Sequence, residues 1–343
     1  MVNFNVYGYR FSVQGDEKAV EGLAQDFAFF TADSADGPTI ELFQADPPLT
    51  NLPVGDALVY TPRNVAYREG HARYIDYHGR GLGILDEISG NFKLYSRDED
   101  LLYEAAYLFL LSRIGEDLDR RGMHRVHALG VEVNGRAILV LLPMGGGKST
   151  LGLHLLRFPE VRLLSDDSPW IDRDGRVLAF PLRLGLLPGS QDSIPAEYRR
   201  KIQRMEFGPK HLVNYSYFAD RVSASAEPGI VFIGSRTMQP ESRIEQAGTL
   251  AGLRPMLANC IVGVGLFQGL EFLLGSGILG LSKKLGVGIS RCRNSWRLLR
   301  SSQVCRIHLG RNSEQNARAI LDYVLHNPSA ARTAPAQPPQ LIR

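Results

Sequence analysis

Short runs in which apolar and polar residues alternate fill the first part of the chain. Examples are NFNVYGYRFSV, TIELFQA and ARYIDYH, which are rich in aromatic and β-branched residues and are separated by Gly, Pro, Asn and Asp. Alternation with this composition is typical of β-strands, and one helix is expected among them at residues 18–30. The pattern therefore predicts a mostly β, α+β N-terminal domain over residues 1–97.

The period of the apolar residues changes at residue 98. The stretch DEDLLYEAAYLFLLSRIGEDLDRRG opens with acidic residues, continues with apolar residues at helical spacing and ends at Gly122. An acidic first turn and a terminal glycine are usual start and stop signals of a helix. Residues 98–122 are therefore predicted to form a long helix that links two domains.

The region 123–326 is predicted to be an α/β domain. Its pattern predicts a strand and turn in HRVHALGVEVNG, a continuous apolar strand in RAILVLLP, a helix in STLGLHLLRF and another strand in VRLLSDD. Strands that alternate with helices are typical of α/β folds. The last residues, 327–343, are rich in Pro and Ala, and such a composition predicts a disordered tail.

The amino-acid composition limits the classes of protein to which the chain can belong. The chain has 343 residues, 44% of them hydrophobic and 22% charged, which is ordinary for a soluble globular protein of two domains. A net charge of +3 without a dense run of Lys and Arg does not favour a nucleic-acid partner. The three cysteines are widely spaced, which fits a reducing compartment better than a disulfide framework or a zinc site. No signal-peptide pattern is present at the N-terminus, so we expect a cytoplasmic protein.

One segment is apolar enough to suggest a membrane span. Residues 260–281, CIVGVGLFQGLEFLLGSGILGL, have the required length. However, Gln268 and Glu271 lie in the middle, and a carboxylate inside a bilayer is costly. The glycines also weaken a single continuous helix. We therefore expect buried helical structure and no membrane partner.

The sequence LLPMGGGKST lies between the apolar strand and the following helix, and it ends like a phosphate-binding loop. Its last residues match the close of the pattern G-x-x-x-x-G-K-[ST], although Leu142 stands where the pattern has its first glycine. Backbone N–H groups in such a loop form an anion nest at a helix N-terminus. The alternative is a turn whose glycines only make the bend. The residues predicted to bind ATP are Met144, Gly145, Gly146, Gly147, Lys148, Ser149 and Thr150.

An Asp pair, Asp166 and Asp167, ends the next predicted strand. Ligands of open parallel sheets bind at the carboxyl ends of the strands. One carboxylate could hold Mg²⁺ and the other could accept the proton of an attacking hydroxyl. We assign the metal to Ser149 and Asp167, but the sequence alone does not say which Asp is the base. The alternative is that the pair caps a turn.

The stretch from HALGVEVNG to DRDGRV, within residues 126–183, resembles the catalytic domain of the HPr serine kinase family. That family shares its nucleotide-binding core with ATP-dependent phosphoenolpyruvate carboxykinase. Its pattern is a His ahead of the loop lysine, a glycine-rich loop and a later Asp-Asp pair, and His127 stands at the His position. The resemblance implies an α/β fold with a P-loop core of the HPr kinase/phosphoenolpyruvate carboxykinase type. It also implies a kinase that uses ATP and Mg²⁺, with His127 and Lys148 near the transferred phosphate.

Downstream of the Asp pair, the chain departs from the family pattern. FPLRLG stands where the family has a stretch with a metal-binding Glu and an Arg. Arg183 matches and is expected to clamp a phosphate, whereas the Glu is missing. The resemblance therefore does not extend to a second metal contact, and it does not support the reverse phosphorylase activity or HPr as substrate. By the same resemblance, Lys210 and Arg221 are candidate substrate-binding residues, with a surface lysine and a structural arginine as the alternatives.

The favoured function is an ATP- and Mg²⁺-dependent kinase that phosphorylates a hydroxyl, with a serine of a protein or peptide as acceptor. A nucleotide-gated binding module with little transfer, whose N-terminal domain recognises a partner, is one alternative. A small-molecule kinase or carboxykinase-like enzyme is another. The sequence leaves open whether the chain forms a homo-oligomer.

Overall fold

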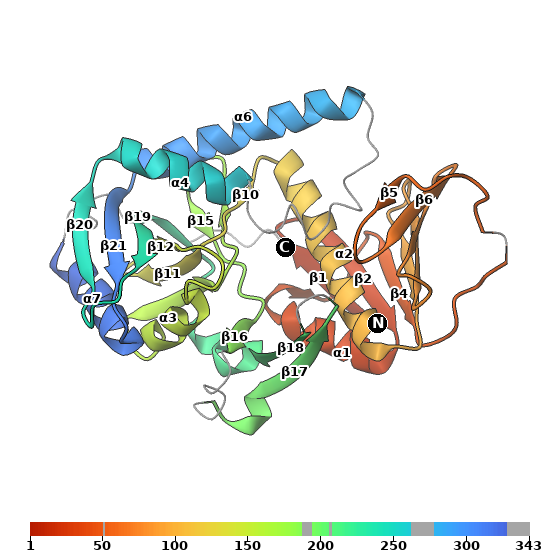
Figure 1. Cartoon of the computed structure of the whole chain (residues 1–343), viewed down its shortest axis with the longest axis horizontal. Helices are drawn as coiled ribbons and strands as arrows, with labels where there is room; N and C mark the ends of the chain where they lie inside the picture. Colours follow the sequence, from red (N-terminus) through yellow and green to blue (C-terminus); the bar gives the residue numbers. More distant parts are fainter. Residues whose placement is uncertain (51, 187–193, 206–207, 262–277, 328–343) are drawn as a thin grey trace.

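A computed structural model describes residues 1–50, 52–186, 194–205, 208–261 and 278–327 (Figure 1). It shows a mixed α/β protein with several sheets, as the sequence predicted. The long helix α2 (Glu99–Arg120) stands between an N-terminal sheet and a C-terminal sheet, and a small third sheet lies beside helix α1 (Glu17–Asp26). Both α1 and α2 begin at an Asp whose side chain accepts a hydrogen bond from the first turn, a standard N-cap.

The N-terminal sheet has the order β3-β1-β2-β4-β9-β8-β7-β6-β5. Only the pairs β2–β4 and β4–β9 are parallel. Helices α1 and α2 pack against it over a core of aromatic side chains. Its strands are β1 (Val2–Val6), β2 (Tyr9–Gly15), β3 (Thr31–Ala32), β4 (Thr39–Phe43), β5 (Val59–Tyr60), β6 (Val65–Glu69), β7 (Ala72–Asp76), β8 (Leu82–Asp86) and β9 (Phe92–Tyr95), with a 3-10 turn, η1 (Ala28–Phe30), after α1.

The C-terminal sheet has the order β10-β14-β15-β19-β12-β11-β13, and β21 joins β19 to β20. Strands β12, β19 and β21 run parallel to one another. The bounds are β10 (His124–Arg125), β11 (Leu129–Val133), β12 (Arg136–Leu141), β13 (Val161–Ser165), β14 (Trp170–Ile171), β15 (Val177–Leu178), β19 (Ser225–Arg236), β20 (Arg243–Ala247) and β21 (Gln303–Leu309).

Helices cover both faces of this sheet. On β12, Ile138 and Val140 face one hydrophobic core, and Leu139 and Leu141 face another. Helices α3 (Lys148–Leu155) and α7 (Ser313–His326) cover the first core, and α4 (Thr249–Ile261) and α6 (Ile278–Arg300) cover the second. A strand buried on both faces reads as a continuous apolar run, which explains the sequence RAILVLLP.

The third sheet has three antiparallel strands in the order β16-β18-β17. Strand β18 (Gly208–Val213) lies in the middle, between β16 (Leu184–Leu186) and β17 (Arg199–Arg204). Short 3-10 turns flank it: η3 (Ala196–Tyr198), η4 (Tyr215–Tyr217) and η5 (Ala219–Arg221).

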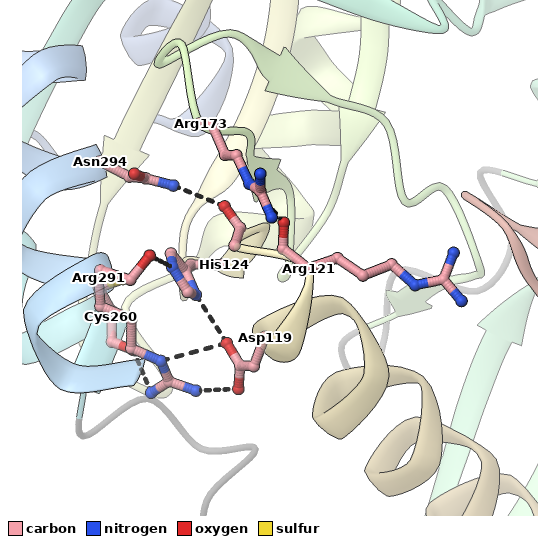
Figure 2. Close-up of polar contacts among 9 residues, drawn as sticks. Asp119, Arg121, His124, Arg173, Cys260, Arg291 and Asn294 are labelled. Atoms are coloured by element: carbon pink, nitrogen blue, oxygen red, sulfur yellow. Dashed lines mark hydrogen bonds and ion pairs between the residues drawn. The ribbon is translucent and has the colours of Figure 1, made fainter. Parts of the chain in front are cut away.

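A buried polar network ties the end of α2 to α6 (Figure 2). Asp119 pairs with Arg291 at 2.6 Å and lies 2.8 Å from Nδ1 of His124, whose Nε2 lies 2.8 Å from Ser290. The order Ser, His, Asp is also that of a hydrolase triad. Here, however, the His124 ring is fully buried and the carboxylate is shared with Arg291. We therefore interpret the network as a structural tie.

Among the described residues, no helix combines the length and the apolar character needed to cross a bilayer. Most of the segment 260–281, for which buried helical structure was expected, lies outside the described residues. The same holds for the predicted disordered tail, of which only Asn327 is described.

Candidate functional site

The glycine-rich loop connects the end of β12 to the first residue of α3. The N–H of Gly146 donates to the carbonyl of Pro143 at 3.0 Å, which makes the turn tight. Gly145 (φ 74°) and Gly147 (φ 91°) have left-handed backbones, which side chains disfavour. The side chain of Leu142, at the place of the missing first glycine, is buried in the core beneath the loop. Leu142 therefore anchors the start of the loop in the core, and the carbonyl of Pro143 occupies the N–H of Gly146.

Lys148 folds back over its own loop. Its Nζ donates to the carbonyl of Leu142 at 3.0 Å and to Nε2 of His127 at 2.9 Å, and lies 3.7 Å from Asp167. Burial lowers the pKa of Lys148, while Asp167 and Asp166 act in the opposite direction. The side chain is only 7% exposed, so its charge is confined to the space above the loop. A phosphate placed there would meet a preoriented cation.

His127 connects Lys148 to Asp167. Because its Nε2 accepts from the lysine, its Nδ1 carries the proton and donates to Asp167 at 3.1 Å. Its backbone N–H donates to the carbonyl of Asn259 in α4, which fixes the position of the residue. Burial alone would raise the pKa of Asp167, but the hydrogen bond from His127 and the charge of Lys148 lower it. Asp167 is therefore held as a carboxylate, and its side chain is 52% exposed.

Asp166 has a different environment. Burial and the neighbouring Asp167 raise its pKa to about 6. Its Oδ2 accepts a hydrogen bond of 2.6 Å from the hydroxyl of Ser149. Its Oδ1 is buried and has no hydrogen-bond partner among the described residues. An unpaired carboxylate oxygen beside a serine hydroxyl suits Mg²⁺, which prefers hard oxygen ligands and is often held by one or two carboxylates together with phosphates.

Both Asp side chains reach the site because β13 ends just before them, at Ser165. The hydroxyl of Ser165 donates to the carbonyl of Phe180 at 2.9 Å and accepts from the N–H of Ser168 at 3.0 Å. The chain thus turns at this point, and the alternation of side chains along a strand no longer separates the two carboxylates. The structure pairs Ser149 with Asp166, whereas the sequence-based hypothesis had paired it with Asp167.

Lys210, in the middle strand β18, lies beside Gly185 and Ser149 and forms another wall of the candidate site. A Cβ added to Gly185 would lie 2.8 Å from Nζ of Lys210 and 3.6 Å from the hydroxyl of Ser149. The backbone N–H of Gly185 also approaches Asp166 at 3.5 Å. Burial and the charge of Arg183 lower the pKa of Lys210, against the effect of Asp166. Among the described residues, the Lys210 ammonium has no hydrogen-bond partner, and it interacts electrostatically with Asp166 and Asp167, as Lys148 does.

The structure does not bring Arg183 and Arg221 to the phosphate loop. Arg183 donates to the hydroxyl of Tyr103 and to Asp26, and its guanidinium lies over the Tyr107 ring at 3.7 Å. The charge of this guanidinium also acts on Lys210, and its expected contact with a phosphate stays a prediction. Arg221 donates to the carbonyls of Phe158 and Val161 beyond α3, so it supports the chain there.

Arg236 is a further residue beside the loop, which the sequence-based reasoning missed. It is exposed at the carboxyl end of β19, the parallel neighbour of β12. Its guanidinium would lie 3.6 Å from a Cβ added to Gly147. Only the adjacency of β19 and β12 reveals this proximity, and no local pattern around Arg236 signals it. Of the other predicted loop residues, Met144 is exposed and Thr150 half-buried.

No protein-family model and no curated protein matches the chain. Among solved structures, it is similar to the HPr(Ser) kinase/phosphatase from Coxiella burnetii. The match has 14% sequence identity and a TM-score of 0.25, and covers 59% of this chain and 87% of that one. A TM-score this low does not establish a common fold. The HPr kinase type of core therefore stays a prediction.

Proposed function

We propose that this protein is an ATP- and Mg²⁺-dependent kinase that phosphorylates a hydroxyl group, with a serine of a protein or peptide as the acceptor. One observation carries the proposal: two carboxylates and the loop lysine converge at the N-terminus of α3. The carboxylates differ, since Asp166 is buried and joined to Ser149 while Asp167 is half-exposed and joined to His127. Carboxylates with such different environments support different roles.

The loop would bind the phosphates of ATP. The first N–H groups of a helix have no partner within the helix, and with the helix dipole they favour an anion. Lys148 would exchange the carbonyls of Leu142 and Pro143, which it now contacts, for phosphate oxygens. Lys210 would approach the same phosphates from another wall, because its ammonium is unpaired among the described residues.

Mg²⁺ fits beside Ser149 and the unpaired Oδ1 of Asp166. When bound, the ion would be held by Ser149 and Asp166 and would supply positive charge against the negative charge that develops during transfer. Asp167 would accept the proton of the acceptor hydroxyl, whose oxygen bonds to the γ-phosphorus as the bond to the leaving ADP oxygen breaks. His127, through its Nδ1–H, would hold the Asp167 carboxylate in the direction of the acceptor.

Phosphate transfer to an acceptor tests the proposal. The full chain is incubated with γ-labelled ATP, Mg²⁺ and lysate fractions separated by mass, with Lys148→Ala as the matched control. Label in a protein or peptide band that depends on Lys148 is the expected result. Label confined to small molecules would instead show a small-molecule kinase. Mg²⁺-ATP binding without any transfer would overturn the kinase and leave a nucleotide-gated binding module.

A further inference from the structure

Asp26, the last residue of α1, is a fully buried carboxylate far from the phosphate loop in sequence. A buried carboxylate is strongly unfavourable unless it is paired and hydrogen-bonded. Both of its oxygens are used: Oδ1 accepts from Arg200, and Oδ2 accepts from the hydroxyl of Tyr103 at 2.5 Å and from Arg183 at 3.3 Å. The N-terminal region thus supplies one anion that binds two arginines of the C-terminal region.

The two arginines stand on the two outer strands of one small sheet. Arg183 directly precedes β16, and Arg200 lies in β17. Strand β18 is hydrogen-bonded between them and carries Lys210, which pairs with Ile202 of β17. The carboxylate of Asp26 therefore binds arginines at both outer strands of the sheet whose middle strand carries Lys210.

Further contacts from the N-terminal region hold the same sheet. Glu104 of α2 accepts a hydrogen bond from the N–H of Met205, beyond the end of β17. The hydroxyl of Tyr7 donates to the carbonyl of Ala179 at 2.5 Å, upstream of β16. These contacts bear on the candidate site because Gly185, in β16, directs its N–H to Asp166.

We propose that Asp26 is a positioning residue for the candidate phosphate site, because it holds the small sheet whose middle strand places Lys210 beside Ser149 and Asp166. The N-terminal domain is then a structural part of the kinase site and not only a separate recognition module. This inference rests on the proposed function. Asp26 itself touches neither nucleotide nor acceptor, and it acts through Arg183 and Arg200. Its effect should therefore vanish once Lys210 has been removed.

Four full-length proteins test the inference: wild type, Asp26→Asn, Lys210→Ala and the double variant. Asp46→Asn, which breaks the exposed pair of Asp46 and Arg97 in the same domain, is the control. The affinity for Mg²⁺ with a non-hydrolysable ATP analogue is measured by calorimetry. Asp26→Asn and Lys210→Ala should each weaken binding about tenfold, as expected for one lost charge-assisted contact, and the double variant should be no weaker than either.

Amide hydrogen exchange separates positioning from general destabilisation. In Asp26→Asn, exchange should rise in peptides that cover residues 183–186 and 208–213, while β12 stays as protected as in the wild type. Exchange that rises throughout the chain, or stays unchanged in these peptides, would overturn the inference. The inference would also be overturned if the affinity losses of Asp26→Asn and Lys210→Ala multiplied in the double variant.

Arg200→Lys provides a second variant in case Asp26→Asn does not fold. It keeps the charge but loses the fork with which Arg200 reaches both Asp26 and the carbonyl of Gly22. The same exchange and affinity changes are expected, in smaller measure, and wild-type values for both would overturn the inference. If the wild-type chain does not bind the Mg²⁺ nucleotide, the proposed function fails. The exchange experiment still decides whether Asp26 holds the sheet.

Discussion

The hydroxyl of Ser149 donates its 2.6 Å hydrogen bond to Asp166, while the neighbouring Asp167 is bound by His127. The two adjacent carboxylates therefore have different partners: Asp166 lies beside the loop serine, and Asp167 lies beside the histidine. We therefore propose Ser149 and Asp166 as the metal ligands and Asp167 as the base, whereas the sequence had suggested Ser149 and Asp167 for the metal.

Removal of the metal ligands should weaken nucleotide binding. Ser149→Ala removes the hydroxyl and Asp166→Asn removes the negative charge of the carboxylate, so the affinity for ATP measured with Mg²⁺ should fall toward the value measured in excess EDTA. Calorimetry under both conditions checks this. If the wild-type affinity for ATP is the same with Mg²⁺ and with EDTA, the proposed metal site is wrong.

Substitution of Asp167 should have a different effect. Asp167→Asn leaves Ser149 and Asp166 in place, so binding of the Mg²⁺ nucleotide should change little. Transfer should slow by ~10²–10⁴-fold, the usual contribution of a general base. Single-turnover measurements with the labelled acceptor separate the two quantities. If Asp166→Asn and Asp167→Asn behave alike, the division of roles is wrong.

Lys148→Ala should abolish nucleotide-dependent activity and leave the fold intact. The ammonium contacts loop carbonyls and His127 rather than apolar core, so its loss removes charge and little packing. Circular dichroism and thermal unfolding test the fold, and ATP turnover tests the activity. Lys93→Ala, at an exposed position of β9, is the matched control. Normal turnover in Lys148→Ala would refute the assignment of the loop.

Glu104 should make the stability of the protein depend on pH. Burial raises its pKa to about 7, against the hydrogen bond from Met205 and the charges of Arg183, Arg204 and Arg63. The fold therefore favours the neutral form. The free energy of unfolding should fall as the pH rises from about 4.5 to about 7, by on the order of 3 kcal/mol from this group.

Glu104→Gln mimics the neutral form and should remove this part of the pH dependence. Asp166, whose pKa is raised to about 6, acts in the same direction and remains in the variant. The difference between wild type and Glu104→Gln, measured by urea unfolding at each pH, isolates Glu104. A difference that stays constant from pH 4.5 to 8 would contradict the expectation.

His124→Ala should destabilise the protein without changing the phosphate site directly. It leaves Asp119 and Ser290 without their shared partner and opens a cavity beside Arg291. We expect a loss of about 2–4 kcal/mol, measured by chemical unfolding. His71→Ala, on the exposed turn between β6 and β7, should stay close to wild type. A neutral result for His124→Ala would show that the network is dispensable.

Local patterns in the sequence were enough to predict the strand, the glycine-rich turn and the helix that form the loop region. The apolar run of β12, the glycines and the following helix are neighbours in sequence, and each has its own signal. The pairing of Ser149 with Asp166 depends on the turn at Ser165, which a strand pattern does not reveal. The role of Arg183 could not be predicted, because its partner Asp26 lies 157 positions away and reaches it only through the packing of separate sheets.

The clamp at Asp26 also bears on how the chain is made. The carboxylate leaves the ribosome long before its partners, since Arg200 follows 174 positions later. Until Arg183 and Arg200 have emerged, Asp26 has the hydroxyl of Tyr103 as a partner but no positive charge from these two arginines, so we expect the packing around it to be completed late. A chain truncated after α2 would lack Arg183 and Arg200, so the carboxylate of Asp26 would have neither arginine partner. The two halves on either side of the end of α2 therefore do not form independent folding units. Two fragments cut at this point should be less stable separately than when they are combined.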